Sequence, residues 1–241
     1  MRMSFRRALL AQGGIPPVPT SWAAHGVVAS TGSWSPDTAG WYRFYVIGQG
    51  GDGGSGDQRY STSSMLINRA VGGGGGGTGG VAVHQLYLTP GNSVSITVDT
   101  TQTELSYGGE TVTATAGGNG GSGVANTLSA GVGGSGGTAT GGNVSNIDGS
   151  QGGNGALNSS GSNESPLSAQ GGAGGTPTAE MKYVASAASS GAATGAAAPY
   201  STDVSNPQLG GGASGGGARS RGSGYSGGAG APGGVVIEAG A

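Results

Sequence analysis

The chain has 241 residues and a formal net charge of −2, and 59 of its residues are glycine and 10 are proline. Average proteins contain about 7% glycine and about 5% proline. Hydrophobic residues make up 34% and charged residues 8% of the chain, against roughly 45–50% and roughly 25% in globular domains. This composition excludes the side-chain-packed core of an ordinary enzyme. If the glycine tracts are ordered, main-chain hydrogen bonds must hold them, because glycine has no side chain to contribute.

The charged residues and the lack of cysteine exclude further classes of function. Lys182 is the single lysine, so no basic stripe is present to neutralise the phosphates of a nucleic acid. Arg219 and Arg221 stand near Tyr225, but two arginines make a weak patch. Without cysteine the chain has no disulfide, no thiolate metal site and no cysteine nucleophile. We therefore expect no nucleic acid partner.

Residues 1–20 are predicted to be an attachment segment that ends in an extended linker. The start is positively charged, but its apolar run, Ala8–Ala11, is shorter than the about 7–15 residues of a secretory signal core. Pro16-Pro17-Val18-Pro19 favours extended backbone because proline fixes φ and lacks an N–H donor. Phe5 and Leu9 have helical spacing, which predicts either a short amphipathic helix that needs a partner surface or a frayed terminus. The residues expected to attach the chain to a larger assembly are Phe5, Arg6, Arg7 and Leu9.

No stretch of the sequence approaches the roughly 20 consecutive apolar residues of a membrane-spanning helix. We therefore expect no membrane insertion. The sequence predicts a product that is made in a cytoplasm and reaches its site of action without the general secretory route.

Residues 21–116 are predicted to form a β-rich domain, a small antiparallel sheet or sandwich. Runs of β-branched and aromatic residues, or of alternating apolar and polar residues, are typical of strands. Pro90-Gly91-Asn92 lies between two such runs and predicts a hairpin by its turn chemistry. A last apolar run, 235–238, follows the glycine-rich region and is expected to complete the same sheet. The other runs are 41–47, 81–88, 93–98 and 111–116.

Residues 117–234 contain tandem Gly-Gly-X tracts with a period of three, and residues 50–55 show the same pattern. Three residues per turn is the period of the polyproline II helix, which makes no internal hydrogen bonds, so its amides must pair with neighbouring segments. Without Cβ atoms the backbones can approach closely. The predicted fold is mainly β with irregular structure and almost no α-helix: a small antiparallel sheet or sandwich that carries a bundle of polyglycine II helices. Loops rich in Ser, Asn, Thr and Ala join the tracts and are expected at the two ends of the bundle.

No motif for catalysis, cofactor binding or metal binding stands out. GxGxxG matches are expected by chance at this glycine content, and Lys182 is not preceded by the glycine of a Walker A motif. The two histidines, His25 and His84, are far apart, and His84 lies in a predicted strand, where a sheet-face residue is the simpler interpretation. The carboxylates show neither an acid pair nor calcium-loop spacing. We expect a protein that is not an enzyme and that uses no cofactor and no metal.

The loops between the glycine tracts hold the candidate binding residues, because loops on a stiff scaffold are common sites of recognition. Tyr183, Tyr200 and Tyr225 stand among small residues, and tyrosine offers a large contact area at low entropic cost. These three tyrosines, together with Asn163, are candidate receptor contacts. The alternative is that each tyrosine fills an end of the bundle.

The order of these motifs resembles the glycine-rich tail-fibre and tail-tip proteins of tailed bacteriophages. The matching features are the Phe5-Arg-Arg start, Gly40-Trp-Tyr-Arg-Phe-Tyr-Val-Ile-Gly-Gln-Gly-Gly51, the polyglycine run 72–80, the strand-like segment 81–98, the tandem tracts, and the ending Gly230-Ala-Pro-Gly-Gly-Val-Val-Ile-Glu238. The organisation is also similar to the distal adhesins of T-even-like phages, in which glycine motifs form a polyglycine helix sandwich and variable loops bind the host surface. The resemblance covers most of the chain beyond the N-terminal segment.

This resemblance implies a virion protein of the tail, made in the host cytoplasm, that attaches to another tail protein. It implies recognition of a host cell-surface glycan or outer-membrane protein through the loops, and several copies per virion, such as a trimer. No catalytic residues of a family carry over. Three alternatives are a purely structural component of a tail or head fibre, an ice-binding polyglycine protein, and a depolymerase, which the missing acid pair disfavours.

Overall fold

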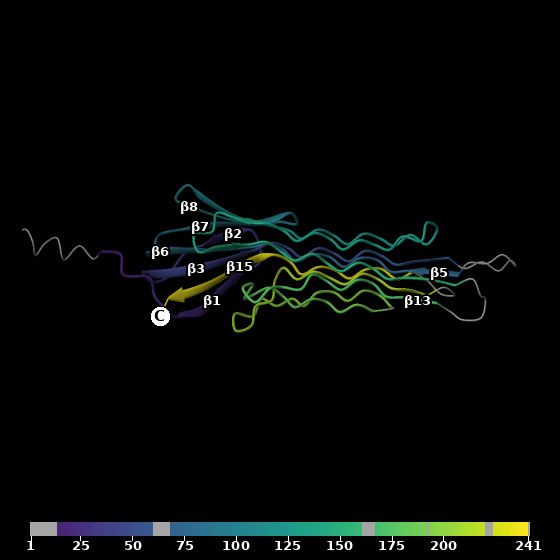
Figure 1. Cartoon of the computed structure of the whole chain (residues 1–241). Coiled ribbons are helices and arrows are strands. Elements are labelled where there is room, and N and C mark those ends of the chain that lie inside the picture. Colours follow the sequence, from purple (N-terminus) through teal and green to yellow (C-terminus); the bar gives the residue numbers. More distant parts are fainter. Residues whose placement is uncertain (1–13, 60–67, 161–166, 192, 220–223, 241) are drawn as a thin grey trace, which may run out of the picture.

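The computed structural model describes residues 14–59, 68–160, 167–191, 193–219 and 224–240. Figure 1 shows two parts, a β-sandwich at one end and a long bundle of extended segments that runs away from it. The described residues form strands and extended segments, and no helix is found among them. The predicted mainly-β fold class with small antiparallel sheets is confirmed.

Two antiparallel five-stranded sheets form the sandwich. The first sheet has the order β1 (Trp22–Val28), β15 (Gly234–Gly240), β3 (Gly40–Ile47), β6 (Val81–Leu88) and β11 (Ser145–Ile147). The second has the order β10 (Ala139–Thr140), β9 (Glu110–Thr115), β8 (Gln102–Tyr107), β7 (Val94–Val98) and β2 (Gly32–Trp34). The predicted return of the C-terminal strand is confirmed, because β15 lies between β1 and β3.

The central strands of the first sheet are buried on both faces. One face packs against the second sheet, where Phe44 and Leu88 meet Ile96 in a cluster of fully buried side chains. Met181 and Leu209 cover the other face from loops of the glycine-rich region. Strands buried on both faces have continuous apolar runs rather than alternating ones, which explains the sequence of the second half of β3 and of the first half of β15.

The predicted hairpin at Pro90-Gly91-Asn92 is wrong. The turn itself forms, with the amide of Asn92 donating to the carbonyl of Thr89 and with Gly91 at a φ of 95°. However, β6 and β7 lie in different sheets, so the turn carries the chain across the sandwich. Turn chemistry specifies the local reversal but not the partner of the strand that follows. The hairpins of this region join β7 to β8 and β8 to β9, the latter through Gly108 and Gly109, which both have positive φ.

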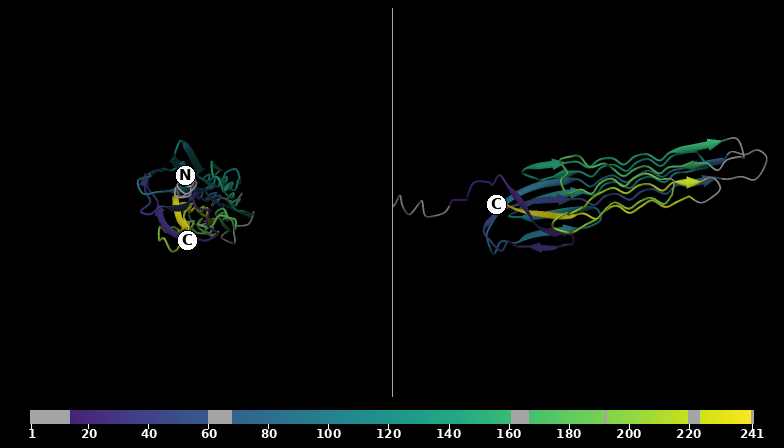
Figure 2. Two further views of the ribbon diagram at one scale, coloured as in Figure 1. Left: turned by 90° about the vertical axis from the view of Figure 1, so that its left-hand side faces the viewer. Right: turned by 90° about the horizontal axis from the view of Figure 1, so that it is seen from below.

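The bundle consists of extended segments, here called rods, that run between the sandwich and the far end of the molecule (Figure 2). Main-chain hydrogen bonds join each rod to its neighbours, and within a rod the donors to any one neighbour recur every third residue. Three residues per repeat is the period that the polyglycine II prediction requires. The rods comprise residues 48–56, 72–80, 117–123, 131–138, 149–156, 170–176, 185–191, 195–198, 210–217 and 224–233.

The rod 72–80 lies at the centre of the bundle and is bonded to six others. Each of its nine amides donates to a main-chain carbonyl at 2.8–3.1 Å, and successive amides turn to rods 149–156, 210–217 and 117–123, with β9 as the last acceptor. Its carbonyls accept from amides of rods 48–56, 131–138 and 170–176. All residues of this rod are buried. The centre of the bundle is therefore made of paired main chain, with Thr78 as its only side chain beyond hydrogen.

Side chains at X positions of the tracts complete the outer layer. The side-chain oxygens of Asn119, Asn154 and Asp52 accept from amides of neighbouring rods, each at 2.8 Å. Each oxygen takes the place of a main-chain acceptor that a further rod would supply. At these three positions a side chain therefore satisfies an outer amide without another rod.

The predicted boundary at residue 116 does not separate the sandwich from the bundle. Rods 48–56 and 72–80 come from inside the segment 21–116 that is predicted to form the β-rich domain. In the opposite direction, β10 and β11 leave the glycine-rich segment 117–234 and join the two sheets. The physical reason is that strands β3 and β6 continue outward as a bonded pair of rods, with the amide of Gly48 donating to Gly80 at 3.0 Å.

We predict that Gly75→Ala destabilises the protein far more than Gly32→Ala. An added Cβ at Gly75 would lie 1.9 Å from the main-chain oxygen of Ala173, whereas a Cβ at Gly32 meets nothing within 4 Å. Overpacking against main chain that is itself hydrogen-bonded leaves no side chain free to move, so the loss is expected at about 3 kcal/mol, the upper end of such costs. Denaturant unfolding checks this, and equal losses for the two variants would contradict the tight rod packing.

Candidate binding surface at the far end of the bundle

The end of the bundle away from the sandwich, here called the tip, is built from short strands and one turn. A three-stranded sheet contains β12 (Leu157–Ser160), β5 (Asn68–Val71) and β4 (Asp57–Arg59), and a two-stranded sheet pairs β13 (Ser168–Ala169) with β14 (Ala218–Arg219). The turn 124–130 lies beside them between two rods. Figure 1 places β5 and β13 together at this end. Segments far apart in the sequence thus meet on one surface.

Small side chains hold the two tip sheets together. Ala70, Ala169 and Ala218 are buried against one another, and Leu167 packs beside them. Because side chains alternate along a strand, the neighbours of these alanines point to the opposite faces. Arg69 and Arg219 therefore face away from the contact between the two sheets.

The turn 124–130 is fixed by its own hydrogen bonds and by two charged residues of the tip sheet. Val124 and Ser129 exchange main-chain hydrogen bonds, and Leu128 has a φ of 55°. Asp57 accepts from the amide of Ala125 at 2.8 Å, and Arg69 donates to the carbonyls of Ala125 and Asn126 at 3.2 and 2.6 Å. The side chains of Asn126 and Thr127 are left exposed to solvent.

The three predicted tyrosines are divided between the two ends of the bundle. Tyr225 lies at the base of the tip, where its carbonyl accepts from the amide of Gly56 at 2.8 Å. Tyr200 lies at the sandwich end with 48% of its surface exposed. Tyr183 also lies at the sandwich end, where its ring packs edge-on against Tyr45 at 4.9 Å between centroids. They do not form a single surface.

The other predicted site residues lie outside the described part of the chain. These are the candidate contact Asn163 and the candidate attachment residues Phe5, Arg6, Arg7 and Leu9. The roles proposed for these residues remain predictions from the sequence. The linker that follows the attachment residues is described from residue 14 and is tied to the sandwich, because Trp41 Nε1 donates to the carbonyl of Pro16 at 2.8 Å.

Tyr183 belongs to a cluster around a buried carboxylate, here called the Glu238 cluster. Glu238 is fully buried on β15 and accepts from Tyr183 at 2.5 Å, from Tyr45 at 3.2 Å and from Lys182. Arg43 Nη1 lies 3.9 Å from its second oxygen. Lys182 and Tyr183 come from a loop, so the cluster fastens that loop over the face of the first sheet.

The pKa values in this cluster are shifted by burial and by the hydrogen bonds. Burial raises the pKa of Tyr183 to about 12, and the hydrogen bond to Glu238 acts in the same direction. Burial acts against the charged forms of Glu238 and Lys182. The hydrogen bonds between them outweigh it, so the pKa of Glu238 lies below its ordinary value and the pKa of Lys182 lies above its own.

We predict that this cluster stabilises the fold between two pH limits. The lowered pKa of Glu238 gives a contribution that is present above pH 4.5 and is lost as the pH falls below that value. The raised pKa values of Tyr183 and Lys182 give contributions that are lost as the pH rises above 10.0 and 10.5, respectively. Melting temperatures across the pH range should therefore fall at both ends more steeply in the wild type than in Glu238→Gln. Identical pH profiles of the two proteins would contradict this role.

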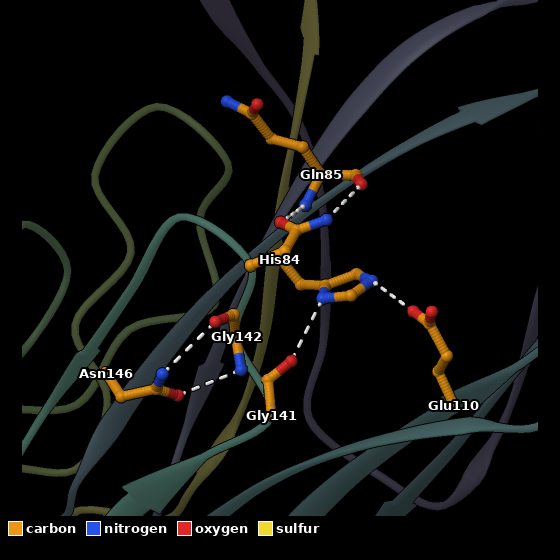
Figure 3. A network of polar contacts seen from close by, with 7 residues as sticks. His84, Gln85, Glu110, Gly141, Gly142 and Asn146 are labelled. Atoms are coloured by element: carbon orange, nitrogen blue, oxygen red, sulfur yellow. Dashed lines mark hydrogen bonds and ion pairs between the residues drawn. The ribbon is translucent and has the colours of Figure 1, made fainter.

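His84 is part of a network of hydrogen bonds that connects the segment 141–146 to β6 (Figure 3). Its Nδ1 lies 3.2 Å from the carbonyl oxygen of Gly141, and its Nε2 lies 3.5 Å from the exposed carboxylate of Glu110 in the second sheet. Asn143 bonds to both main-chain polar groups of Gln85. These partners make the network a link between sheets. His25 packs among the rings of Trp34 and Tyr42.

The structure offers no metal centre in the ranges that it describes, since no group of three or more His, Asp or Glu side chains gathers there. The same ranges hold no helix long and apolar enough to cross a bilayer. Comparisons of the chain with protein-family models and with curated proteins find no match. No related protein therefore indicates a binding surface, and the tip is identified as the candidate from its geometry.

Arg59 and Arg69 are tip residues that the sequence analysis did not single out. Each stands within three residues of a glycine tract, as does Arg219. A charged residue placed where a Gly-Gly-X tract begins or ends is a usable signal, because the ends of rods are the ends of the bundle. The Glu238 cluster offers no such signal, because Lys182 and Glu238 are separated by 56 positions and the chain between them forms four rods of the bundle.

Proposed function

We propose that this protein is a bacteriophage tail-fibre or tail-tip protein that recognises a host cell-surface receptor through the tip. The attachment segment at the N-terminus joins it to another tail protein. The protein is made in the host cytoplasm and is carried in the virion tail. Attachment to the host is non-covalent recognition of a surface glycan or an outer-membrane protein.

The observation that supports this proposal is the polarity of the molecule. Residues 14–20 leave the sandwich on the side away from the bundle, and the tip lies at the opposite end (Figure 1). A protein that bridges a particle and a cell needs two binding ends held apart by a stiff spacer. The bonded rods supply the spacer, because each rod is fixed by several neighbours along its length.

The way the tip is connected also supports recognition. Each tip segment is entered and left through rods whose order is fixed by main-chain bonds, so the tip residues are not needed to hold the bundle together. Residues freed from a structural role can be selected for binding. Several copies per virion, such as a trimer, add avidity to weak contacts.

We predict that a bulky label blocks binding to cells when it is placed on the tip but not at the sandwich end. The chain has no cysteine, so Asn126→Cys and Tyr200→Cys each provide a single site for a maleimide-linked polymer. Both residues are exposed, and they lie at opposite ends of the bundle. With a panel of bacterial strains and fluorescent protein, the label at position 126 is expected to weaken binding about tenfold or more, the loss of one good contact.

The unlabelled cysteine variants serve as controls and are expected to bind as the wild type does. A block at position 200 alone would move the receptor surface to the sandwich end and contradict the proposal. Binding to none of the strains, with a place inside the tail or head fibre by electron microscopy of the parent particle, would favour a purely structural role. Thermal hysteresis without cell binding would favour an ice-binding protein.

A further inference from the structure

Charge is divided between the two ends of the molecule. Within the described ranges the tip holds three arginines and one carboxylate, whereas the sandwich end holds eight carboxylates and two cations. Both cations of the sandwich end, Arg43 and Lys182, lie against Glu238. Among the described residues, the tip is therefore the positive end of a protein whose net charge is negative.

Two of the tip arginines stand side by side. Arg59 of β4 and Arg69 of β5 are directly opposed partners in the antiparallel ladder, so their side chains leave the same face of the tip sheet. Like charges in directly opposed positions destabilise a sheet. The pair is thus a cost to folding, in which Arg69 also fixes the turn 124–130 whereas Arg59 is exposed to solvent.

Asp57, the one carboxylate among the described tip residues, forms no ion pair with these arginines. Both oxygens of Asp57 are used by main-chain amides, those of Gln58 and Ala125, each at 2.8 Å. Arg69 is held in place because one of its nitrogens, Nη1, donates to two carbonyls of the turn 124–130. Arg59 and Arg219 are exposed, and among the described residues neither forms a hydrogen bond or an ion pair. The donors that Arg59 and Arg219 carry are available to a ligand.

We infer that the tip binds anionic groups, phosphate or carboxylate, on a bacterial surface polysaccharide. This inference rests on the proposed function and names the chemistry of the receptor. Arginine suits both groups because its planar guanidinium donates two parallel hydrogen bonds to a pair of anionic oxygens. The hydrogen bonds to the turn 124–130 hold the guanidinium of Arg69 in place. The exposed guanidinium of Arg59 beside it donates the paired hydrogen bonds to the anion. Arg219, on the opposite face of the tip, extends the positive field around the end of the bundle.

The division of charge also orients the molecule as it approaches. A cell surface rich in phosphate or carboxylate attracts the tip and repels the acidic sandwich end. Such attraction acts over a Debye length of about 8 Å at physiological ionic strength. The positive tip therefore favours encounters in which the tip meets the surface first.

The test measures binding of the full chain to matched polysaccharides. The probes are lipopolysaccharide and its dephosphorylated form, polygalacturonate and its methyl ester, and neutral dextran. The wild type is expected to bind at least one charged member about tenfold tighter than its neutral counterpart, as charge-assisted hydrogen bonds require. The phosphate and carboxylate pairs distinguish the two sources of charge.

Two double variants distinguish the effect of losing the tip arginines from the effect of a lower net charge. Arg59→Gln with Arg219→Gln lowers the net charge by two and is expected to weaken binding about tenfold or more. The matched control, Thr202→Glu with Asn206→Asp, lowers the net charge equally at exposed positions of the sandwich end. The control is expected to bind within about twofold of the wild type, because these positions lie a whole rod length, far beyond a Debye length, from the tip. Unchanged melting temperatures show that both variants are folded.

The outcomes separate this inference from the proposed function. Equal binding to charged and neutral members of both pairs, or equal loss in the two double variants, overturns the arginine site. Binding to cells that the tip label blocks, without binding to any charged probe, overturns the inference and leaves the proposed function standing. Binding to neither cells nor probes overturns both.

Discussion

Main-chain hydrogen bonds across the rod 72–80 are the interaction on which the rest of the structure depends. In an ordinary domain the centre is apolar side chains, and the main chain is satisfied within helices and sheets. Here the centre is main chain that bonds to six neighbouring rods, and a Cβ atom added at any of its glycines would strike a neighbouring main-chain oxygen. A net gain of about 0.5–1.5 kcal/mol per bond must offset the entropy of ordering glycine. Only a nearly complete network can do so.

The sandwich gives this network its starting register. Strands β3 and β6 are paired through Ile47 and Val81, and the pairing continues without interruption into rods 48–56 and 72–80. The sandwich has the large buried apolar clusters, whereas the buried clusters of the bundle and the tip consist of alanines. It thus acts as a conventional core that aligns the first rods, after which each later rod finds its position by hydrogen bonding. The ends of the aligned rods then determine where the strands of the tip lie.

The sequence predicted the parts of the fold that have a local signal. The period of three in the Gly-Gly-X tracts predicted the rods, and the apolar run 235–238 predicted the returning strand. The central place of 72–80 was hidden, because a run of bare glycines carries no X residue to show a direction. The candidate site was predicted only as loops on a stiff scaffold. Which loops share an end depends on the number of passes along the bundle, and this is why Tyr183, Tyr200 and Tyr225 fell at different ends.

The three-residue repeat also sets which changes in length the chain can accept during evolution. Each residue added to a rod rotates the rest of that rod by a third of a turn. The amides that follow would then face the wrong neighbouring rods. Only insertions in multiples of three keep the phase. The tip segments are free of that rule, since they begin and end outside the repeat. The molecule can therefore exchange whole blocks of tip sequence, of any length, on an unaltered stem.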